Sequence, residues 1–399
     1  MRRRDTLKLL LAPLGAPARA NGAMPLPAKA AVADPQLSQA LQNAGPAVRR
    51  VLADATFEPQ ILWTRFARDA HGQWQAKVTQ QWGVQRQRWF AAASFIKLPV
   101  AALLGEVLCR RGLVNQINDL HLHVDRADAC APLPQGPSWP LASLLRAMLV
   151  VSDNRSYNAL VELLGSDAVH ARLAEIGYPD SRIGARLGCA AATRPGKLAA
   201  RLTDSRGHLL WDSPAIPEEK PQPFPFGVAQ KGRAWLQNGQ LIAGPRDFTT
   251  SNFMPLNEVH RMTMELGSGS APAENAFVLC PAMREWLRAT MLMTPRQCAD
   301  TRCGQWPDDH GKWLIASDAQ GHLPASLDIA SKNAQAFGYL GDSAFIVDNA
   351  RNLAFGLSAS IFVDRDGVLN DGRYAYTDIG RPFLRELGAA ILAFERRAE

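Results

Sequence analysis

The chain lacks several features that would assign it to large classes of proteins. Beyond its N-terminal segment it has no apolar run of 18 residues, so no membrane-spanning helix is expected. It has no Cys-x-x-Cys spacing of the kind that holds zinc, and no glycine-rich loop that could cradle a phosphate. It also has no internal repeat. A length of 399 residues with 47% hydrophobic residues indicates an ordinary globular protein with a large core.

Two short patterns resemble fragments of metal sites but lack the remaining ligands. His121 and His123 alternate in a strand-like segment with no third ligand nearby, whereas zinc sites use three or four protein ligands. Asp364, Asp366 and Gly367 resemble the start of a calcium loop without its later acidic ligand, and a turn explains them better. We therefore expect neither a metal nor a cofactor.

The first 20 residues have the pattern of an export signal. A basic start with Arg3 and Arg4 precedes a short apolar run, and Ala18-Arg19-Ala20 fits a small-x-small cleavage site. The paired arginines favour twin-arginine export, and a general secretory signal is the alternative. Either signal predicts a periplasmic or secreted bacterial protein. Residues 21–35, rich in alanine and proline, are expected to form a flexible leader after cleavage.

Much of the net positive charge lies in that signal. Residues 1–20 contain five basic residues and one acidic residue, so their removal lowers the net charge from +7 to +3. A charge of this size gives no support for nucleic-acid binding. The sequence leaves the oligomeric state open, and we take a monomer as the expectation.

The six cysteines fit an oxidising compartment. Cys298 and Cys303 flank a short polar loop and are the best disulfide candidates. Cys109 and Cys280 lie in apolar runs and are expected to behave as small buried hydrophobes. The pairing of the other two, which lie near loops, stays open: Cys130 and Cys189.

Apolar periodicity and turn residues predict a mixed helical and stranded fold. Residues 37–53 are predicted to form a helix with a possible kink at Gly45-Pro46, and residues 61–79 a hairpin. Five prolines between residues 214 and 225 interrupt region 190–250, where Asn238-Gly239 predicts one further hairpin, and we interpret this region as an insertion. The other expected elements are helices at 141–150, 156–164, 257–266, 282–293 and 381–397, and strands at 343–349 and 354–363.

The run 93–99 contains the strongest candidate for a catalytic centre. Ser94 is followed three residues later by Lys97, at the start of an apolar run that predicts a buried helix. Residues three apart lie on one face of a helix, so the lysine amine can reach the serine oxygen. A buried lysine with a lowered pKa can take the proton of a serine hydroxyl and make it a nucleophile. The alternative for this pair alone is a helix-capping serine beside a solvated lysine.

Two later motifs favour the catalytic interpretation. Ser152-Asp153-Asn154 follows an apolar helix, and Lys332 lies in the run Ser331-Lys332-Asn333-Ala334. Taken singly, the first could be a helix cap and the second a surface lysine. The ordered set Ser-x-x-Lys, Ser-Asp-Asn, Lys-Thr-Gly is typical of class A β-lactamases and penicillin-binding proteins. The chain therefore resembles the penicillin-recognising serine hydrolases, and class A β-lactamases most closely, over roughly residues 36–399.

The resemblance implies a fold and an acylation reaction. The fold would be α/β (α+β) of the β-lactamase/transpeptidase type, an antiparallel sheet flanked by the terminal helices plus an all-helical lobe, with the active site between them. Ser94 would attack a carbonyl and become acylated. Lys97 would accept its proton or take part in a relay. Ser152 would pass the proton to the leaving nitrogen.

The resemblance also implies three supporting roles. Asn154 would position the general base and the substrate amide. Lys332 would hold the proton-passing serine and a substrate carboxylate electrostatically. The backbone N–H groups of Ser94 and Gln335 would form the oxyanion hole, and each such donor typically contributes about 10²–10³ in rate.

The chain departs from the family pattern at two places. The third motif is Lys332-Asn333-Ala334, without the usual threonine and glycine, so one hydroxyl contact to a carboxylate is lost and the cleft narrows. Class A enzymes also carry a glutamate that activates the deacylating water, and that place falls near Leu187. Since no glutamate lies between Glu175 and Glu218, the acylation machinery is expected to be present and the known deacylation base absent.

The sequence therefore predicts an exported serine hydrolase that cleaves an amide, such as a β-lactam, through an acyl-Ser94 intermediate. Its partner would be a small-molecule or peptidoglycan-peptide substrate. The alternatives are a D-alanyl-D-alanine peptidase or cell-wall amidase, and a penicillin-binding sensor module that releases its acyl group slowly. A glutaminase, which also uses Ser-x-x-Lys, is disfavoured by the export signal.

Overall fold

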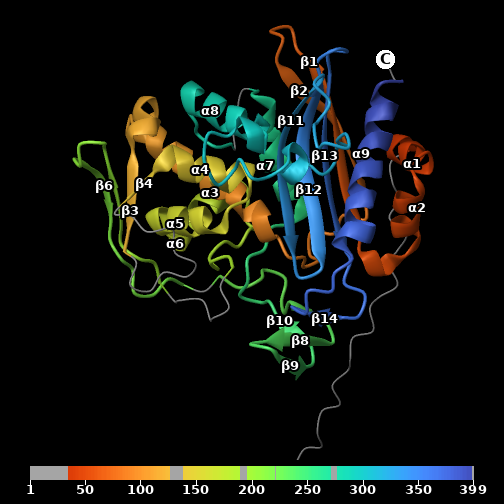
Figure 1. The fold of residues 1–399 in the computed structure, drawn as a ribbon, viewed down its shortest axis with the longest axis horizontal. Coiled ribbons are helices and arrows are strands. Elements are labelled where there is room, and N and C mark those ends of the chain that lie inside the picture. The colour runs from red at the N-terminus through yellow and green to blue at the C-terminus, as the bar shows by residue number, and fades with distance from the viewer. Residues whose placement is uncertain (1–34, 126–137, 189–195, 221, 271–275, 398–399) are drawn as a thin grey trace, which may run out of the picture.

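The computed structural model describes residues 35–125, 138–188, 196–220, 222–270 and 276–397 (Figure 1). The predicted export signal and nearly all of the predicted leader lie outside these residues, as do Cys130 and Cys189. None of the described helices combines the length and the apolar character needed to cross a membrane.

Runs of helices and runs of strands follow one another along the described chain. The helices are α1 (Pro35–Gln42), α2 (Pro46–Ala53), α3 (Lys97–Arg110), α4 (Leu141–Val150), α5 (Asn154–Leu164), α6 (Ser166–Glu175), α7 (Leu256–Ser268), α8 (Pro281–Leu292) and α9 (Arg381–Glu395). The strands are β1 (Gln60–Arg68), β2 (Trp74–Trp82), β3 (His121–Val124), β4 (Trp139–Pro140), β5 (Ala200–Thr203), β6 (Leu209–Ser213), β7 (Gln230–Lys231), β8 (Ala234–Gln237), β9 (Gln240–Ala243), β10 (Arg246–Asp247), β11 (Leu327–Ala336), β12 (Tyr339–Asp348), β13 (Leu353–Phe362) and β14 (Val368–Leu369).

The main sheet has five antiparallel strands in the order β11-β12-β13-β1-β2. The first strand along the chain, β1, therefore pairs with the last long strand, β13, and β2 pairs with β1 at the edge of the sheet. β12 is buried at every position and β13 at all but its last, so both are covered on both faces. β11 lies at an edge, which leaves one side of its backbone open toward the helical lobe (Figure 1).

The terminal helices α1, α2 and α9 cover one face of this sheet (Figure 1). Trp63 of β1 and Leu387 of α9 lie in the core between them. α9 approaches closely enough that a Cβ on Gly388 would lie 1.6 Å from the backbone oxygen of Leu314. The predicted N-terminal helix is two helices, because Gly45 has an extended backbone and Pro46 starts the second one.

The helical lobe faces the other side of the sheet, with α7 and α8 against the strands and α3 to α6 beyond them (Figure 1). α3 is buried along nearly its whole length, as its continuous apolar run predicts. A disulfide between Cys109 and Cys280 joins the end of α3 to the start of α8. Our expectation of two separate buried hydrophobes was wrong here, because a pairing across 171 residues leaves no local pattern in the sequence.

Region 190–250 attaches to other parts of the chain through its strands. β5 and β6 extend a small sheet with β3 and β4, and β8 pairs with β9 on one side and with β14, near the C-terminus, on the other. The predicted hairpin at Asn238-Gly239 is confirmed, with β8 and β9 meeting at these two residues. The antiparallel sheet, its flanking helices and the helical lobe agree with the predicted fold class.

Candidate active site

Ser94 lies on a single 3₁₀ turn, Ala93–Ile96, that runs directly into α3. The turn begins with Ala93 in the left-handed region, at a φ of 43°, which breaks the preceding chain direction. The turn packs against β11, so the hydroxyl is presented where the sheet meets the helical lobe. The helix starts at Lys97, at the start of the apolar run that predicted it.

Lys97 is fully buried and faces Ser94. Its Nζ lies 3.0 Å from Ser94 Oγ, 2.8 Å from Asn154 Oδ1 and 3.1 Å from Ser152 Oγ, and it also contacts the Ser152 carbonyl. Burial holds the pKa of Lys97 well below its usual range, the charge of Lys332 lowers it further, and Asp153 opposes both effects.

A neutral Lys97 fits these contacts. A neutral amine has two N–H donors and one lone pair, and the two carbonyl oxygens of Asn154 and Ser152 can only accept. The lone pair is then directed to the Ser94 hydroxyl, which can donate to it at 3.0 Å. In this arrangement neutral Lys97 would be placed to accept the proton of Ser94.

Ser152 connects the two lysines. Its Oγ lies 3.1 Å from Lys97 Nζ and 2.9 Å from Lys332 Nζ. Ser152 has a φ of 61°, a left-handed conformation that is unfavourable for serine and turns the chain sharply between α4 and α5. Asp153 then caps α5, accepting the Ser156 N–H at 2.7 Å. This cap starts α5 at Asn154, two residues before the predicted position.

Lys332 reaches the site from edge strand β11 and is 1% exposed. Its Nζ donates to Ser152 Oγ, to the Asn333 carbonyl at 3.1 Å and to Asn333 Oδ1 at 3.0 Å. Burial lowers the pKa of Lys332 to about 7, against the opposing charge of Asp342. When Lys332 is protonated, it is a desolvated cation, and such a cation attracts a carboxylate strongly.

The structure thus brings together five predicted side chains from three parts of the chain. They come from the 3₁₀ turn and α3, from the turn before α5, and from β11: Ser94, Lys97, Ser152, Asn154 and Lys332. Gln335 lies three residues further along β11, opposite Leu340, with an exposed side chain. Its backbone role in an oxyanion hole stays a prediction.

Leu187, the position that counting along the chain singled out, lies on a segment that passes close to Asn154. The next residue, Gly188, is close enough that a Cβ there would lie 3.4 Å from Asn154 Nδ2. The sequence did not single out the residue that anchors this segment, Asn158, whose side chain bonds the Leu187 backbone. Its position four residues after Asn154 on one face of α5 was the available signal.

The acidic residues around this segment are engaged in structural pairs. Glu162 accepts from Arg186 at 2.8 Å and from the Leu198 N–H at 2.6 Å. Asp180 forms an ion pair with Arg86. Both carboxylates therefore already have partners within the protein. The residue at position 187 itself is an aliphatic leucine.

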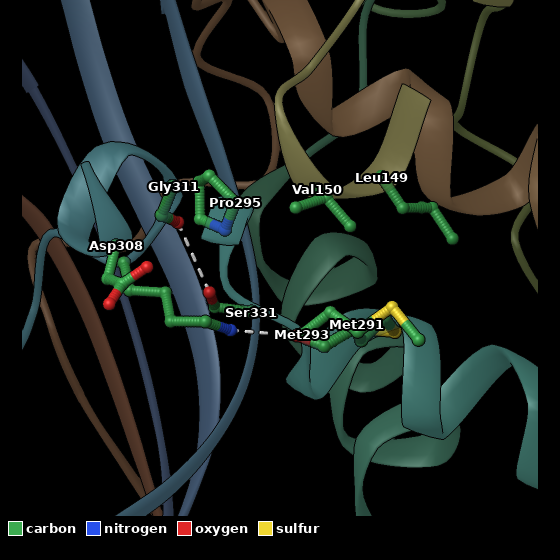
Figure 2. Close-up of a pocket in the computed structure, with 9 residues that line it drawn as sticks. Leu149, Val150, Met291, Met293, Pro295, Asp308, Gly311 and Ser331 are labelled. Carbon is green, nitrogen blue, oxygen red and sulfur yellow. Dashed lines mark hydrogen bonds between the residues drawn. The ribbon is translucent and has the colours of Figure 1, made fainter. Parts of the chain in front are cut away.

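Figure 2 shows a small cavity behind β11, between the ends of α4 and α8. Its volume of about 10 Å³ matches a single water molecule, so it is too small for a substrate. Fully buried Lys312 borders it and donates to the Met291 carbonyl at 2.8 Å and to that of Ile329. Burial lowers the pKa of Lys312 to about 8. Ser331, next to Lys332, donates to the Gly311 carbonyl at 3.2 Å.

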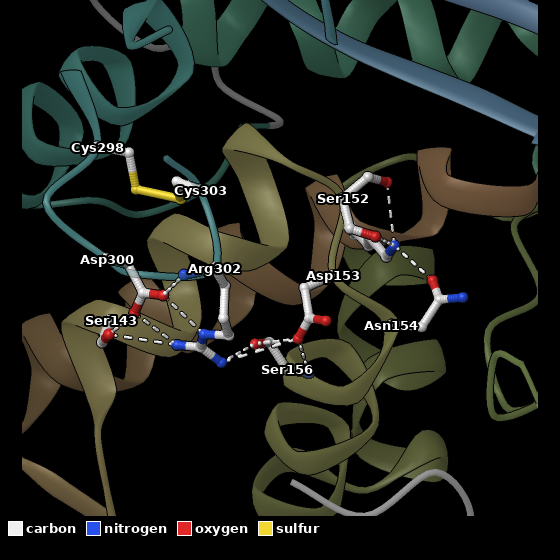
Figure 3. A network of polar contacts seen from close by, with 10 residues as sticks. Ser143, Ser152, Asp153, Asn154, Ser156, Cys298, Asp300, Arg302 and Cys303 are labelled. Carbon is white, nitrogen blue, oxygen red and sulfur yellow. Dashed lines mark hydrogen bonds and ion pairs between the residues drawn. A yellow bond between two sulfur atoms is a disulfide. The ribbon is translucent and has the colours of Figure 1, made fainter. Parts of the chain in front are cut away.

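The metal-like patterns have other partners. His123 Nε2 lies 3.1 Å from Thr203 Oγ1 within the β3–β5 pair. Asp364 Oδ1 accepts the Gly367 N–H at 3.2 Å, as in a turn. Within the described ranges no group of three or more His, Cys, Asp or Glu side chains is placed to hold a metal ion. Cys298 and Cys303, the disulfide candidates, are joined (Figure 3).

The chain is similar to known proteins in part of its sequence and in its fold. Residues 67–207 match the model of the beta-lactamase enzyme family, a segment that includes Ser94, Lys97 and Ser152-Asp153-Asn154 and ends before Lys332. No curated protein sequence matches the chain. The solved structure of PBP-A superposes with a TM-score of 0.50 at 14% identity, covering 90% of this chain and 96% of that one.

Two further solved structures are similar. One is a PBP-A variant in an acyl-enzyme complex with penicillin G, with the same identity, coverage and TM-score. The other is a beta-lactamase from Xanthomonas campestris pv. campestris, at 16% identity and a TM-score of 0.45 over 89% of this chain and 96% of that one. The likeness to PBP-A confirms the predicted β-lactamase/transpeptidase-like fold. The family match confirms the resemblance to the penicillin-recognising serine hydrolases.

Proposed function

We propose that the chain is an exported serine hydrolase of class A β-lactamase type that cleaves an amide, such as a β-lactam, through an acyl-Ser94 intermediate. The observation that carries the proposal is the buried amine of Lys97, 3.0 Å from Ser94 Oγ and 2.8 Å from Asn154 Oδ1. A structural lysine would be expected to remain charged and paired with a carboxylate, whereas this one faces a hydroxyl.

The proposed acylation moves one proton around the site. Ser94 Oγ attacks the substrate carbonyl carbon while its proton passes to neutral Lys97. Ser152, in contact with both lysines, relays a proton to the leaving nitrogen as the C–N bond breaks. The backbone N–H groups of Ser94 and Gln335 would stabilise the oxyanion. A water molecule then hydrolyses the ester and restores the Ser94 hydroxyl.

Recognition of a substrate carboxylate would depend mainly on Lys332. In place of the usual threonine hydroxyl, Asn333 uses its Oδ1 to accept from Lys332 at 3.0 Å. Its Nδ2 points to the His310 carbonyl at 3.4 Å. The asparagine side chain is therefore occupied within the protein, which supports weaker carboxylate binding than in enzymes that keep the hydroxyl.

A second candidate is a penicillin-binding sensor, or a D-alanyl-D-alanine peptidase, in which a β-lactam adduct persists. The observation that favours it is Leu187, an aliphatic residue on the segment that packs against Asn154. A mutant of PBP-A, a protein of the same fold, has been solved as an acyl-enzyme with penicillin G. In this candidate the acylation step is unchanged and only the hydrolysis of the ester is slow.

Intact-mass spectrometry of the protein without residues 1–20, followed over time after mixing with benzylpenicillin, tests both candidates. A transient adduct with consumption of the β-lactam supports the hydrolase. A lasting adduct that Ser94→Ala abolishes supports the penicillin-binding candidate. The absence of any adduct on the wild-type protein would contradict both, and would direct attention to other amides.

A further inference from the structure

The turn that carries Ser152 and Asn154 is supported from outside by one arginine. Arg302 lies in the short loop that the Cys298–Cys303 disulfide closes, between α8 and β11 (Figure 3). This loop packs beside α4 and α5, and Arg302 lies on the opposite side of Asp153 from Asn154 (Figure 3). The sequence predicted the disulfide but no role for the residues that it encloses.

Arg302 is held rigidly within its own loop. Its Nε donates to Asp300 Oδ1 and its Nη2 to Asp300 Oδ2, both at 2.7 Å, a two-pronged pair that fixes the plane of the guanidinium. The Asp300 carboxylate is only 7% exposed and also accepts from the Ser143 hydroxyl of α4. The pair is therefore tied both to the closed loop and to the helix that precedes the turn.

The free edge of the guanidinium points at the turn. Arg302 Nη1 donates to Ser156 Oγ at 2.9 Å and lies 3.8 Å from Asp153 Oδ2. Ser156 Oγ in turn donates to the same Asp153 oxygen at 2.6 Å. Arg302 also donates to Ser143 Oγ at 3.2 Å, so it contacts α4, the turn and α5 at once.

The turn needs such support because its geometry is unfavourable. Ser152 is held at a φ of 61°, which an isolated serine rarely adopts. The next two residues in the chain face opposite ways: Asp153 faces Arg302, whereas Asn154 contacts Lys97 at 2.8 Å. A shift of Asp153 would move Ser152 and Asn154 together, and with them the contacts of Lys97.

We propose that Arg302, presented by the disulfide-closed loop, is a positioning residue for acylation that acts through Asp153 and Ser156. It does not touch the reacting atoms. This role rests on the proposed function, because the step it supports is acylation of Ser94. Without Arg302 the turn would still form, but Ser152 and Asn154 would be held less accurately around Lys97.

The first test compares three variants in single-turnover acylation by benzylpenicillin. Arg302→Gln is expected to lower the saturating acylation rate by roughly 10²-fold, the size of effect that small misplacements cause, with little change in the half-saturating concentration. Arg302→Lys should recover part of the rate, because an ammonium can still reach Ser156. Arg396→Gln, which breaks the 2.7 Å ion pair to Asp348 on the far side of the sheet, is the control and should acylate normally.

The disulfide is tested by a matched pair of double variants. Cys298→Ser with Cys303→Ser should slow acylation in the manner of Arg302→Gln. Cys109→Ser with Cys280→Ser removes the other described disulfide and should lower the melting temperature without a comparable loss of rate at a temperature where both proteins stay folded. Equal losses in the two pairs would contradict a specific role for the loop.

Amide hydrogen exchange separates failure of this proposal from failure of the proposed function. In Arg302→Gln the Ser156 amide, bonded to Asp153, should exchange faster than in the wild type, whether or not penicillin reacts. No adduct on the wild-type protein would overturn the proposed function, and the exchange result alone would then decide whether Arg302 positions the turn. The inference would be overturned if the Arg302→Gln protein showed the same Ser156 amide exchange rate and the same acylation rate as the wild type.

Discussion

The side chain of Asn158 brackets the backbone of Leu187. Its Oδ1 accepts the Leu187 N–H at 2.8 Å and its Nδ2 donates to the Leu187 carbonyl at 3.0 Å. The two bonds fix this residue from α5, while Gly188 lies against Asn154. The backbone of Leu187 is therefore held in place close to Asn154, and the chemistry of the side chain at this position can be changed without moving the backbone.

Leu187→Glu is expected to speed hydrolysis of the acyl-enzyme. A carboxylate on this anchored segment can act as general base for a water molecule, which typically contributes about 10²–10⁴ in rate. The lifetime of the penicillin adduct, measured by intact mass, should shorten accordingly. Leu187→Gln has a similar shape but no basic carboxylate and should keep the wild-type lifetime. A folded Leu187→Glu protein with an unchanged adduct lifetime would contradict this role.

Acylation should require the neutral form of Lys97, and its rate should fall as the pH is lowered. The pKa of Lys97 is depressed by burial and by the charge of Lys332, so the neutral form persists below the usual lysine range. In Lys332→Gln the missing positive charge favours protonated Lys97, and the acid limb of the pH–rate profile should move to higher pH. Ser94→Ala, with no acylation at any pH, is the control. An unmoved acid limb in a folded Lys332→Gln protein would argue against Lys97 as the titrating base.

Protein stability should fall in acid because of His260. This side chain bonds Thr64 Oγ1 and Ser358 Oγ, both at 2.7 Å, and burial lowers its pKa to about 3. Since the folded pKa lies below the unfolded value, the stabilisation is complete above about pH 6.5 and is lost as the pH falls toward 3, by up to about 1.4 kcal/mol per pH unit.

Denaturant unfolding between pH 7 and 4 measures this loss. His170 and His310, whose pKa values burial lowers to about 4, add to the slope. His260→Gln should lower stability at pH 7 but flatten the dependence on pH. His71→Gln changes an exposed histidine and should leave the curve unaltered. An equally steep curve in the His260→Gln protein would assign the acid sensitivity to other groups.

Gly388→Ala should destabilise the protein, although alanine is the better helix former by about 1 kcal/mol. A Cβ at this position would lie 1.6 Å from the Leu314 carbonyl oxygen, so α9 must shift away from the segment before β11 that carries Leu314. We expect a loss of roughly 2–4 kcal/mol in the free energy of unfolding, as for other overpacked sites. Ala389→Gly, at the exposed neighbouring position, should cost only about 1 kcal/mol. Unchanged stability in Gly388→Ala would mean that α9 is loosely docked.

Local elements of the fold could be predicted from the sequence because short-range physics sets them. α4 begins and ends at the predicted residues, since an apolar run between a proline and a sharp turn leaves few alternatives. The Asn238-Gly239 hairpin forms where its two turn residues lie. Ser94 and Lys97 lie within hydrogen-bond distance because residues three positions apart on a helical turn lie on the same face.

The contacts between distant segments were decided by the tertiary structure alone. Cys109 and Cys280 are 171 positions apart, and Arg302 and Ser156 are 146 positions apart. No local sequence pattern indicates that either pair is in contact. The same holds for the depressed pKa of Lys97, which arises from burial and from Lys332 on another lobe. Sequence patterns indicate which residue types are available for a reaction. The desolvation of Lys97 and the alignment of the site side chains arise only when the two lobes pack together.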